Sequence, residues 1–402
     1  MTVRNSLALG IICTIILHIS GTVNSLLLEP QPDKLSEDGR LTFPEIATKY
    51  GFPAEQENII TKDGYILSLF HIPGNVSSPV LLIHGNTLTA DSWIDRGNTS
   101  LAITLARRGG FDVWAINLRG SRYSRKHITL DPDTQPSQFF DFSFYEQAIY
   151  DLPPTIDFIL EKTGQAKLMA IGISVGTTML YVLGAELPEY NDKIKIGISL
   201  APISFVQNLR GAAAVGVALG PLLVDGLKLL NIYEVENYNQ TAPLFQAICL
   251  VPGGYTLCIK IGLFSLTGED TDGLEPEFQN TIFGHFPGGT SLKVLEHLMQ
   301  VARSKKFARF DYGSLENLKV YKRLNPPEFD LKKVRMKSAL FVGEQDFLGT
   351  VEDAELLRSS LPNVVHYQVL PYKKFNHVDF FWGRYMTENF YPYLLEVIDK
   401  YN

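Results

Sequence analysis

The sequence predicts an α/β fold with a mostly parallel central sheet and an inserted helical cap. Buried-strand patterns alternate with helix patterns along the first half of the chain, which is typical of a parallel sheet covered by helices. The alternation stops near Ile203 and returns near Ser338, and helix-rich sequence fills the interval. A serine between two glycines separates one of the predicted strands from the helix that follows it.

Apolar runs predict the strands in order. Two strands are expected within Glu57 to Ile72, around a turn at Asp63-Gly64. The later strands are expected at residues 79–83, 111–117, 167–171, 194–200, 338–342 and 364–370.

Helices are expected between these strands. The prolines Pro153 and Pro154 fall inside one of them, where they either kink it or start its second half. Pro392 falls in the first turn of the last helix, where a missing N–H is harmless. The expected ranges are 45–50, 100–108, 145–162, 177–183 and 391–401.

The 402 residues, of which 45% are hydrophobic and 20% charged, suit one large core with an inserted subdomain. The formal net charge of -7 argues against a nucleic acid partner, and we expect a monomer. The expected parts are a signal peptide at 1–25, the first part of the core at 26–202, the cap at 203–330 and the second part of the core at 331–402.

Residues 1 to 25 have the pattern of a secretory signal. Arg4 precedes an apolar stretch from Leu7 to Ile19, and Val23-Asn24-Ser25 offers a cleavage site. The stretch is shorter than the ~20 apolar residues that a membrane span needs. We therefore expect a protein that is secreted, or delivered to the lysosome through the secretory pathway, with no transmembrane span in the mature chain.

Cysteines and sequons fit such a compartment. Cys13 lies in the signal, so Cys249 and Cys258 remain, and an oxidising compartment favours a disulfide between them. No histidine cluster lies near them, so no metal site is expected. Asn-x-Ser/Thr sequons predict glycans at Asn75, Asn98 and Asn239.

The strongest chemical signal is Gly172-Ile173-Ser174-Val175-Gly176. This is the spacing of a nucleophile elbow, where the chain turns so sharply that the residues two before and two after the serine must be small. Ser199, in Gly197-Ile198-Ser199-Leu200-Ala201, lacks the second glycine and is interpreted as structural. Ser174 is therefore the predicted nucleophile.

The predicted acid and base follow the serine in the order Ser, Asp, His, which is the chain order of α/β-hydrolases. His377 lies in a polar loop after the last strand and is expected to take the serine proton. Asp346 follows the strand at 338–342 and is expected to orient the imidazole ring.

Three other carboxylates lie near the predicted pair. Glu344 and Asp353 compete with Asp346, whereas Asp379 is too close to His377 in sequence to orient its ring easily. The oxyanion is expected to be held by the backbone N–H groups of Val175, directly after the nucleophile, and Asn86, after the strand at 79–83.

Segments along nearly all of the mature chain carry a resemblance to one family. They are Tyr50 to Pro53, Thr61 to Leu67, Phe111 to Trp114 with Asn117 to Gly120, Tyr150 to Pro153 with Thr155 to Phe158, Pro287 to Ser291, Asp311 to Gly313 and Asn376 to Phe380. Together they resemble the acid lipase family, which includes gastric and lysosomal acid lipases and many insect lipases.

The resemblance implies hydrolysis of triacylglycerols or sterol esters at a lipid interface, without a cofactor. Ser174, Asp346 and His377 fall on the family's catalytic positions, and both mature cysteines lie where the family forms a disulfide. The chain departs from the family pattern at Ile173 and Val175, where the family has His and Gln, and at Asn86, where it has Leu. A third family cysteine in the cap is missing.

Two other classes of function stay open. The altered residues beside the nucleophile would suit a hydrolase-fold protein that binds or carries lipid with little turnover. An esterase for small soluble esters is the weaker alternative, because the predicted cap is large and apolar. The intact triad and elbow glycines favour the lipase.

The apolar run from Gly211 to Leu230 has two interpretations. It is either a buried helix pair broken at Pro221, or a movable lid over Ser174 that opens at a lipid interface. Pro221, Asp225 and Lys228 interrupt the run, which argues against a transmembrane span.

Overall fold

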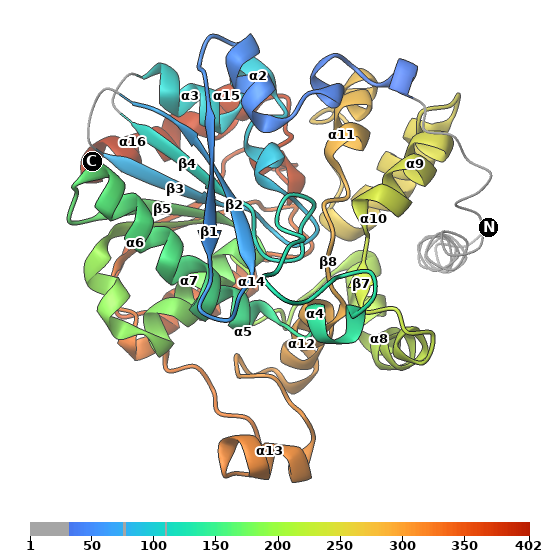
Figure 1. The fold of residues 1–402 in the computed structure, drawn as a ribbon. Helices are drawn as coiled ribbons and strands as arrows, with labels where there is room; N and C mark the ends of the chain where they lie inside the picture. The colour runs from blue at the N-terminus through green and yellow to red at the C-terminus, as the bar shows by residue number, and fades with distance from the viewer. Residues whose placement is uncertain (1–31, 75–77, 109–110) are drawn as a thin grey trace.

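A computed structural model describes residues 32–402 of the chain, except 75–77 and 109–110 (Figure 1). The signal peptide expected at residues 1–25 and the sequon residue Asn75 therefore lie outside the described residues.

One eight-stranded sheet forms the centre of the structure, in the order β1-β2-β4-β3-β5-β6-β9-β10. The pairs β1–β2 and β2–β4 are antiparallel, and all the other neighbouring pairs are parallel. The strands are β1 Glu55–Ile60, β2 Ile66–Ile72, β3 Pro79–Ile83, β4 Asp112–Ile116, β5 Leu168–Ile173, β6 Ile194–Leu200, β9 Lys337–Val342 and β10 Val364–Val369. The predicted mostly parallel sheet is confirmed.

Both faces of this sheet are buried, which explains why its strands read as continuous apolar runs. In β3, Val80 and Leu82 belong to one hydrophobic core, while Leu81 and Ile83 belong to the other. Side chains from α2 (Phe43–Lys49), α3 (Leu101–Arg107) and α16 (Tyr391–Tyr401) complete the first core. Side chains from α6 (Leu152–Thr163), α7 (Val175–Glu186) and α14 (Val351–Ser360) complete the second.

The helices around the sheet are α2 Phe43–Lys49, α3 Leu101–Arg107, α4 Pro136–Phe139, α5 Phe144–Glu146, α6 Leu152–Thr163, α7 Val175–Glu186, α14 Val351–Ser360, α15 Met386–Asn389 and α16 Tyr391–Tyr401. The helices α2, α3, α7 and α16 lie close to the expected ranges, whereas α4, α14 and α15 lie outside them. The helix expected at 145–162 is divided. A π-helical turn, Gln147–Asp151, joins α5 to α6, and both Pro153 and Pro154 lie in the first turn of α6.

Between β6 and β9 the chain leaves the large sheet and forms the inserted segment, residues 203–330. Its elements are α8 Gly211–Leu229, β7 Glu234–Val235, α9 Tyr238–Cys249, α10 Phe264–Thr267, α11 Gln279–His285, β8 Thr290–Ser291, α12 Leu292–Ser304 and α13 Ser314–Tyr321. β7 and β8 pair with each other in a small antiparallel ladder.

The expectation that Pro221 breaks a buried helix pair is wrong. α8 is one continuous helix with Pro221 inside it. The residue before the proline is Gly220, which has no Cβ to clash with the ring. The glycine also lets α8 approach α12, because a Cβ there would lie 1.9 Å from the Met299 sulfur.

Most of α8 faces outward instead of filling a core. Leu222 is 77% exposed and Leu229 is 88% exposed, whereas Ala212, Gly220 and Val224 are buried. Among the described residues, α8 is the one helix whose length and apolar composition would suffice to cross a bilayer, with 17% of that stretch buried in the protein.

A disulfide joins Cys249, the last residue of α9, to Cys258 in the following π-helical turn Thr256–Leu263. Replacing both cysteines with serine should lower the free energy of unfolding by about 2 kcal/mol, because the short closed loop gains freedom mainly in the unfolded chain. Thermal unfolding of the variant and of the reduced wild type should agree. Peptide mapping without reductant should give one linked pair, and two alkylatable thiols in the purified protein would contradict the pairing.

Candidate active site

Ser174 occupies a strained turn between β5 and α7. Its φ is 54° and its ψ is -124°, a conformation that side-chain-bearing residues rarely adopt. The two flanking glycines are required by contact. A Cβ on Gly176 would lie 2.4 Å from the Ile83 carbonyl oxygen, and one on Gly172 would lie 2.8 Å from the Gly176 backbone.

Hydrogen bonds hold this turn in place. The Ser174 N–H donates to the Leu200 carbonyl at 3.0 Å, which ties the turn to the end of β6. The Thr177 hydroxyl donates to the Ser174 carbonyl at 2.6 Å and accepts from the Ile203 N–H at 3.0 Å. The serine backbone is therefore fixed from both sides.

The structure joins His377 directly to Asp346. The ring Nδ1 lies 2.8 Å from one carboxylate oxygen and 3.0 Å from the other, and both side chains are buried. One of those oxygens also accepts from the N–H groups of Leu348 and Gly349, each at 2.8 Å. These bonds fix the carboxylate that orients the ring.

The competing carboxylates have other partners. Glu344 pairs with Lys373 at the surface. Asp353 lies in the first turn of α14 and accepts from the backbone N–H groups of Gln207 and Asn208. Asp379 accepts from the Asn376 N–H.

Ser174 lies at the same edge of the sheet as this pair. It follows β5, while Asp346 follows β9 and His377 follows β10, and the strand order β5-β6-β9-β10 places all three at adjacent carboxyl ends. Among the hydrogen bonds of the described residues, none joins the Ser174 hydroxyl to the imidazole. The other serine considered, Ser199, is fully buried and bonds to the Tyr181 hydroxyl at 2.5 Å, as a structural residue would.

The inserted segment holds the loop that carries the histidine. The carbonyl of Thr267 accepts from the His377 N–H at 3.2 Å. The Gly268 carbonyl accepts from the Asn376 side-chain amide at 2.8 Å. A Cβ on Gly268 would collide with the Gln345 carbonyl, so the segment approaches the Asp346 turn as closely as backbone can.

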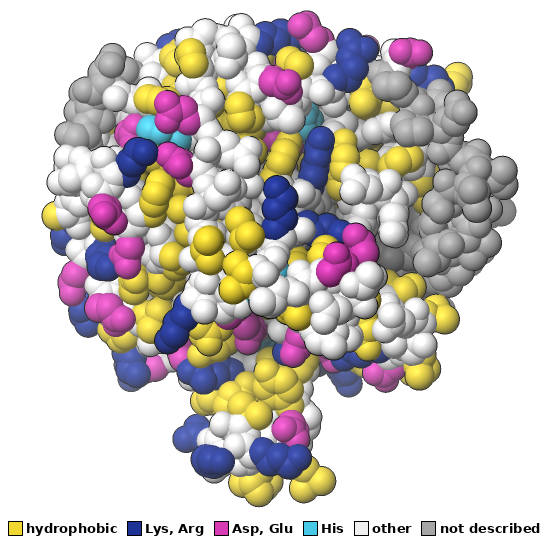
Figure 2. Space-filling model, viewed as in Figure 1, with side chains coloured by type: hydrophobic (Ala, Val, Ile, Leu, Met, Phe, Trp, Pro, Cys, Tyr) yellow, Lys and Arg dark blue, Asp and Glu magenta, His cyan; other side chains and the backbone are white. Residues whose placement is uncertain are grey.

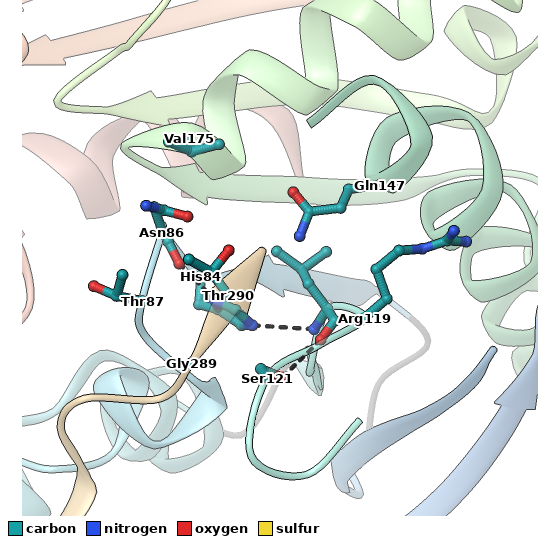
Figure 3. Close-up of a pocket in the computed structure, with 11 residues that line it drawn as sticks. His84, Asn86, Thr87, Arg119, Ser121, Gln147, Val175, Gly289 and Thr290 are labelled. Carbon is teal, nitrogen blue, oxygen red and sulfur yellow. Dashed lines mark hydrogen bonds between the residues drawn. The ribbon is translucent and has the colours of Figure 1, made fainter. Parts of the chain in front are cut away.

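Asn86 and Val175 line one small cavity (Figure 3), which is where two oxyanion donors would have to meet. Val175 begins α7, so its N–H is one of the unpaired donors at a helix N-terminus. The other lining residues are His84, Gly85, Thr87, Leu118, Arg119, Ser121, Gln147, Gly289 and Thr290.

His84 fixes the loop that carries Asn86. Its Nε2 accepts from the Leu118 N–H at 3.0 Å, so the proton must be on Nδ1, which donates to the Gly85 carbonyl at 2.7 Å. Burial lowers the pKa of His84 to about 4, which keeps the ring neutral in this arrangement.

Most of the cavity residues were not predicted as site residues from the sequence, among them Gln147 and Thr290. Gln147 lies in the π-helical turn, and its amide points into the space that the lining residues enclose (Figure 3). Helical periodicity did not indicate which way Gln147 points, because a π-helical turn shifts the residues out of the spacing of an α-helix. Thr290 comes from the inserted segment, which no local pattern connects to this edge.

Besides the histidine loop, the inserted segment also contacts the loop that carries Asn86 and Thr87. The Glu236 carboxyl hydrogen-bonds Thr87, and burial raises the pKa of Glu236 to about 7. The Gly288 N–H donates to the Thr87 carbonyl at 2.6 Å.

Within the described residues, no group of three or more His, Cys, Asp or Glu side chains is arranged to hold a metal ion.

Asp270 and Asp379 form a buried carboxyl pair beside the histidine loop. A Cβ on Gly273 would lie 2.6 Å from an Asp270 oxygen and 2.7 Å from an Asp379 oxygen, so the two oxygens border one spot. Burial is the main cause that raises the pKa of both groups, and at Asp379 the neighbouring Asp270 adds to it. The pair is therefore arranged to share a proton.

Two family models match the chain. One, described as the alpha/beta hydrolase fold, covers residues 78–216, and the other, a partial alpha/beta-hydrolase lipase region, covers residues 43–97. A solved structure of a soluble variant of monoglyceride lipase from Saccharomyces cerevisiae superposes with a TM-score of 0.54 at 15% identity, over 90% of this chain and 97% of the other. That likeness concerns the fold alone.

Several proteins are similar along nearly the whole chain. Lipase 1 of Drosophila melanogaster is 33% identical over 92% of this chain and 82% of its own length. Gastric triacylglycerol lipase of Mus musculus is 34% identical over 86% of this chain and 88% of its own. A Crotalus adamanteus protein provisionally named lysosomal acid lipase/cholesteryl ester hydrolase is 32% identical over 94% of this chain and 96% of its own.

The carboxyl pair generates a pH-dependent prediction. The folded chain keeps the Asp379 proton to a higher pH than the unfolded chain, in which an aspartate titrates near its ordinary pKa of about 4. The stability from this group is full below that value and is lost as pH rises through the folded-state pKa. Relative to wild type, Asp379→Asn should therefore gain in Tm as the pH rises, by about 2 °C or more.

Thermal unfolding of wild type and Asp379→Asn, measured from about pH 4 upward, tests the effect. Asp272→Asn is the matched control, because Asp272 lies in the same turn but is exposed and paired with Lys374 at 2.6 Å. The control should show no comparable rise in relative Tm with pH. A constant Tm difference between Asp379→Asn and wild type would contradict the shared proton.

Proposed function

Because this chain belongs to the acid lipase family of α/β-hydrolases, we propose that it cleaves lipid esters through a triad of Ser174, His377 and Asp346. One observation carries the proposal. A serine held at positive φ shares a sheet edge with a buried histidine–carboxylate pair. The sequence order Ser, Asp, His supports the same assignment.

In the proposed reaction, the Ser174 hydroxyl attacks the ester carbonyl carbon while His377 takes its proton on Nε2. That nitrogen is the one available, since Nδ1 faces Asp346. The imidazolium then gives the proton to the departing alcohol, which leaves an acyl-serine. Water attacks the acyl carbon with His377 again as the base, and the acid is released with the serine restored.

The negative charge on the carbonyl oxygen requires donors that are already in place. The backbone N–H groups of Asn86 and Val175 are the proposed donors, and the cavity that both residues line supports this role. Because these donors are main-chain groups, the Asn86 side chain, which differs from the family's leucine, should affect the rate less than the loop position does.

The proposed substrates are triacylglycerols or sterol esters. The printed names of two relatives, one for triacylglycerol and one for cholesteryl ester, support this class. The inserted segment, residues 203–330, is the proposed cap, and exposed α8 is its proposed lid. The N-terminal turn of α8 touches the catalytic edge, since the Arg210 N–H donates to the Phe347 carbonyl, one residue after Asp346.

The proposed location is the secretory route, either outside the cell or in the lysosome. The signal pattern and the gastric and lysosomal relatives support it. Asn98 and Asn239 are exposed, as N-glycan sites must be, and we propose that they carry glycans on a monomeric protein.

The first prediction from this proposal concerns the triad. Ser174→Ala should lower ester hydrolysis by ~10⁴-fold or more, and His377→Ala should lower it equally, because the three residues act as a unit. Asp346→Asn should keep the fold and lose most turnover. Labelling with a fluorophosphonate, followed by mapping of the modified peptide, checks the nucleophile.

The matched controls are Ser199→Ala and Glu344→Gln. Ser199 is buried against Tyr181, and Glu344 pairs with Lys373 at the surface, so both variants should retain hydrolysis. Label on Ser199, or greater loss from Glu344→Gln than from Asp346→Asn, would overturn the assignment. A folded protein that binds lipid and takes no label would favour the carrier hypothesis.

The second prediction concerns α8. Leu222 is largely exposed, and Leu223 is half-buried beside it. A lipid interface would receive this apolar face and favour an open cap. Hydrolysis of an insoluble ester should therefore rise sharply once the substrate exceeds its solubility, and L222S/L223S should flatten that rise. Hydrolysis of a short soluble ester should be spared, and equal losses on both substrates would show that α8 has no interfacial role.

A further inference from the structure

A short helical projection leaves the body of the protein at α13. Residues 311–326, here called the α13 knob, extend beyond the rest of the molecule (Figure 1), and their surface shows hydrophobic and basic side chains together (Figure 2). The exposed apolar side chains include Leu315, which is 81% exposed, and Leu324, which is 57% exposed. The others are Tyr312, Leu318 and Val320.

Side-chain hydrogen bonds hold the knob in a defined conformation. Its buried Asn317 donates to the Asp311 carboxylate at 2.7 Å and to the Leu324 carbonyl at 2.9 Å, so it bridges the two legs. Asp311 is fixed to α12, because its backbone N–H and carbonyl both bond the Gln300 side chain. These bonds hold the exposed apolar side chains in an ordered segment. Ordered apolar side chains that face solvent are typical of an interaction site, whereas a frayed loop would lack such bonds.

Positive charge gathers around these apolar side chains. Between residues 303 and 328 the chain has seven basic and three acidic side chains, a net charge of +4, whereas the whole chain has -7. Among the ion pairs of the described residues, Lys319 pairs with Glu316, Lys306 with Glu328, and Arg309 with Glu186, which lies outside this stretch. Lys322 and Arg323 take part in no ion pair within the described part of the chain.

A hollow of about 460 Å³ opens at the base of the knob. Arg323 and Lys306 both line it, and because Glu328 in the same hollow pairs with Lys306, Arg323 is the cation it offers to an anion, beside Leu324 and Pro326. An anionic group of headgroup size would be held there by charge while the leucines reach past it. The remaining lining residues are Leu324, Asn325, Pro326 and Glu328.

These features together favour a lipid surface over other partners. A soluble polyanion would use the cations and leave the leucines in water. A protein would need a cavity shaped to a convex tip whose apolar side chains are scattered over several turns. A bilayer surface deforms around such a tip, receives leucines among its acyl chains and presents negative headgroups to the basic residues.

We propose that the α13 knob is an adsorption site for anionic lipid surfaces, inserting Leu315, Leu318 and Leu324 while Lys322 and Arg323 contact negatively charged headgroups. The proposal rests on the proposed function only in taking a lipid surface as the place where substrate is met. It adds a contact that depends on charge to the apolar contact proposed for α8. Anionic surfaces should therefore hold the protein better than neutral ones.

Adsorption can be measured without turnover. The full mature chain with Ser174→Ala is sedimented with vesicles of phosphatidylcholine, or of an equal mixture of phosphatidylcholine and phosphatidylserine. We expect stronger binding to the mixed vesicles, weakened by salt. On this background, K322E/R323E should lower the partition coefficient by about thirtyfold or more, because the separate contributions of two basic side chains near an anionic surface are lost. L315S/L318S should lower it by about tenfold.

Matched controls distinguish the knob from general charge or stickiness. K167E/K195E makes the same charge change in a different basic hollow, at the amino ends of β5 and β6. Ile128→Ser removes an apolar side chain that is 61% exposed elsewhere. Both controls should bind within about twofold of the parent. Thermal unfolding should show that every variant is folded.

Several results would overturn the proposal. Equal binding to the two vesicle types, equal binding of the knob variants and the parent, or equal loss in K167E/K195E would each do so. Failure of the proposed function would be separate, since fluorophosphonate labelling away from Ser174 would leave the adsorption measurements unchanged.

Discussion

The sharp turn at Ser174 constrains the residues around the carboxyl edge of the sheet, where the proposed triad lies. The first turn of α7 lies so close to the end of β3 that Gly176 has no room for a side chain. That contact brings the start of α7, with the Val175 N–H, next to the loop that carries Asn86. Strain at the serine is held by the hydrogen bonds of Thr177 and by the end of β6. The turn that positions Ser174, the proposed nucleophile, therefore also positions the proposed oxyanion donors.

The sequence predicted the sheet well because buried parallel strands must be apolar throughout. In β3 and β5 every side chain meets one of two cores, and short continuous apolar runs bounded by turn residues are typical of such strands. Of the two interpretations of α8, the buried helix pair broken at Pro221 failed because two local rules conflicted with tertiary context. Pro221 usually interrupts a helix, but the preceding Gly220 has no Cβ to meet the proline ring, and an apolar helix usually lies inside, but this one lies outside.

At the candidate site, chain order and position after a strand were enough to predict that Asp346 pairs with His377. Gln147, Glu236 and Asp270 could not be found in that way. Gln147 approaches from a π-turn, and Glu236 and Asp270 approach from the inserted segment, where their neighbours are Thr87 and Asp379, far away in the sequence. Periodicity reports which face a residue lies on, but it does not report which distant segment packs against it.

The bonds from Thr267 and Gly268 to the histidine loop have a consequence for how such proteins diversify. The insertion is not a detachable module, because one of its turns helps hold the loop of His377, the proposed catalytic base. A chimera that takes the whole insertion from a relative would also have to import the matching loop around Asn376, or lose the alignment of the imidazole. Substrate range can change freely only at the outer helices, and the inner turn must change together with the hydrolase core.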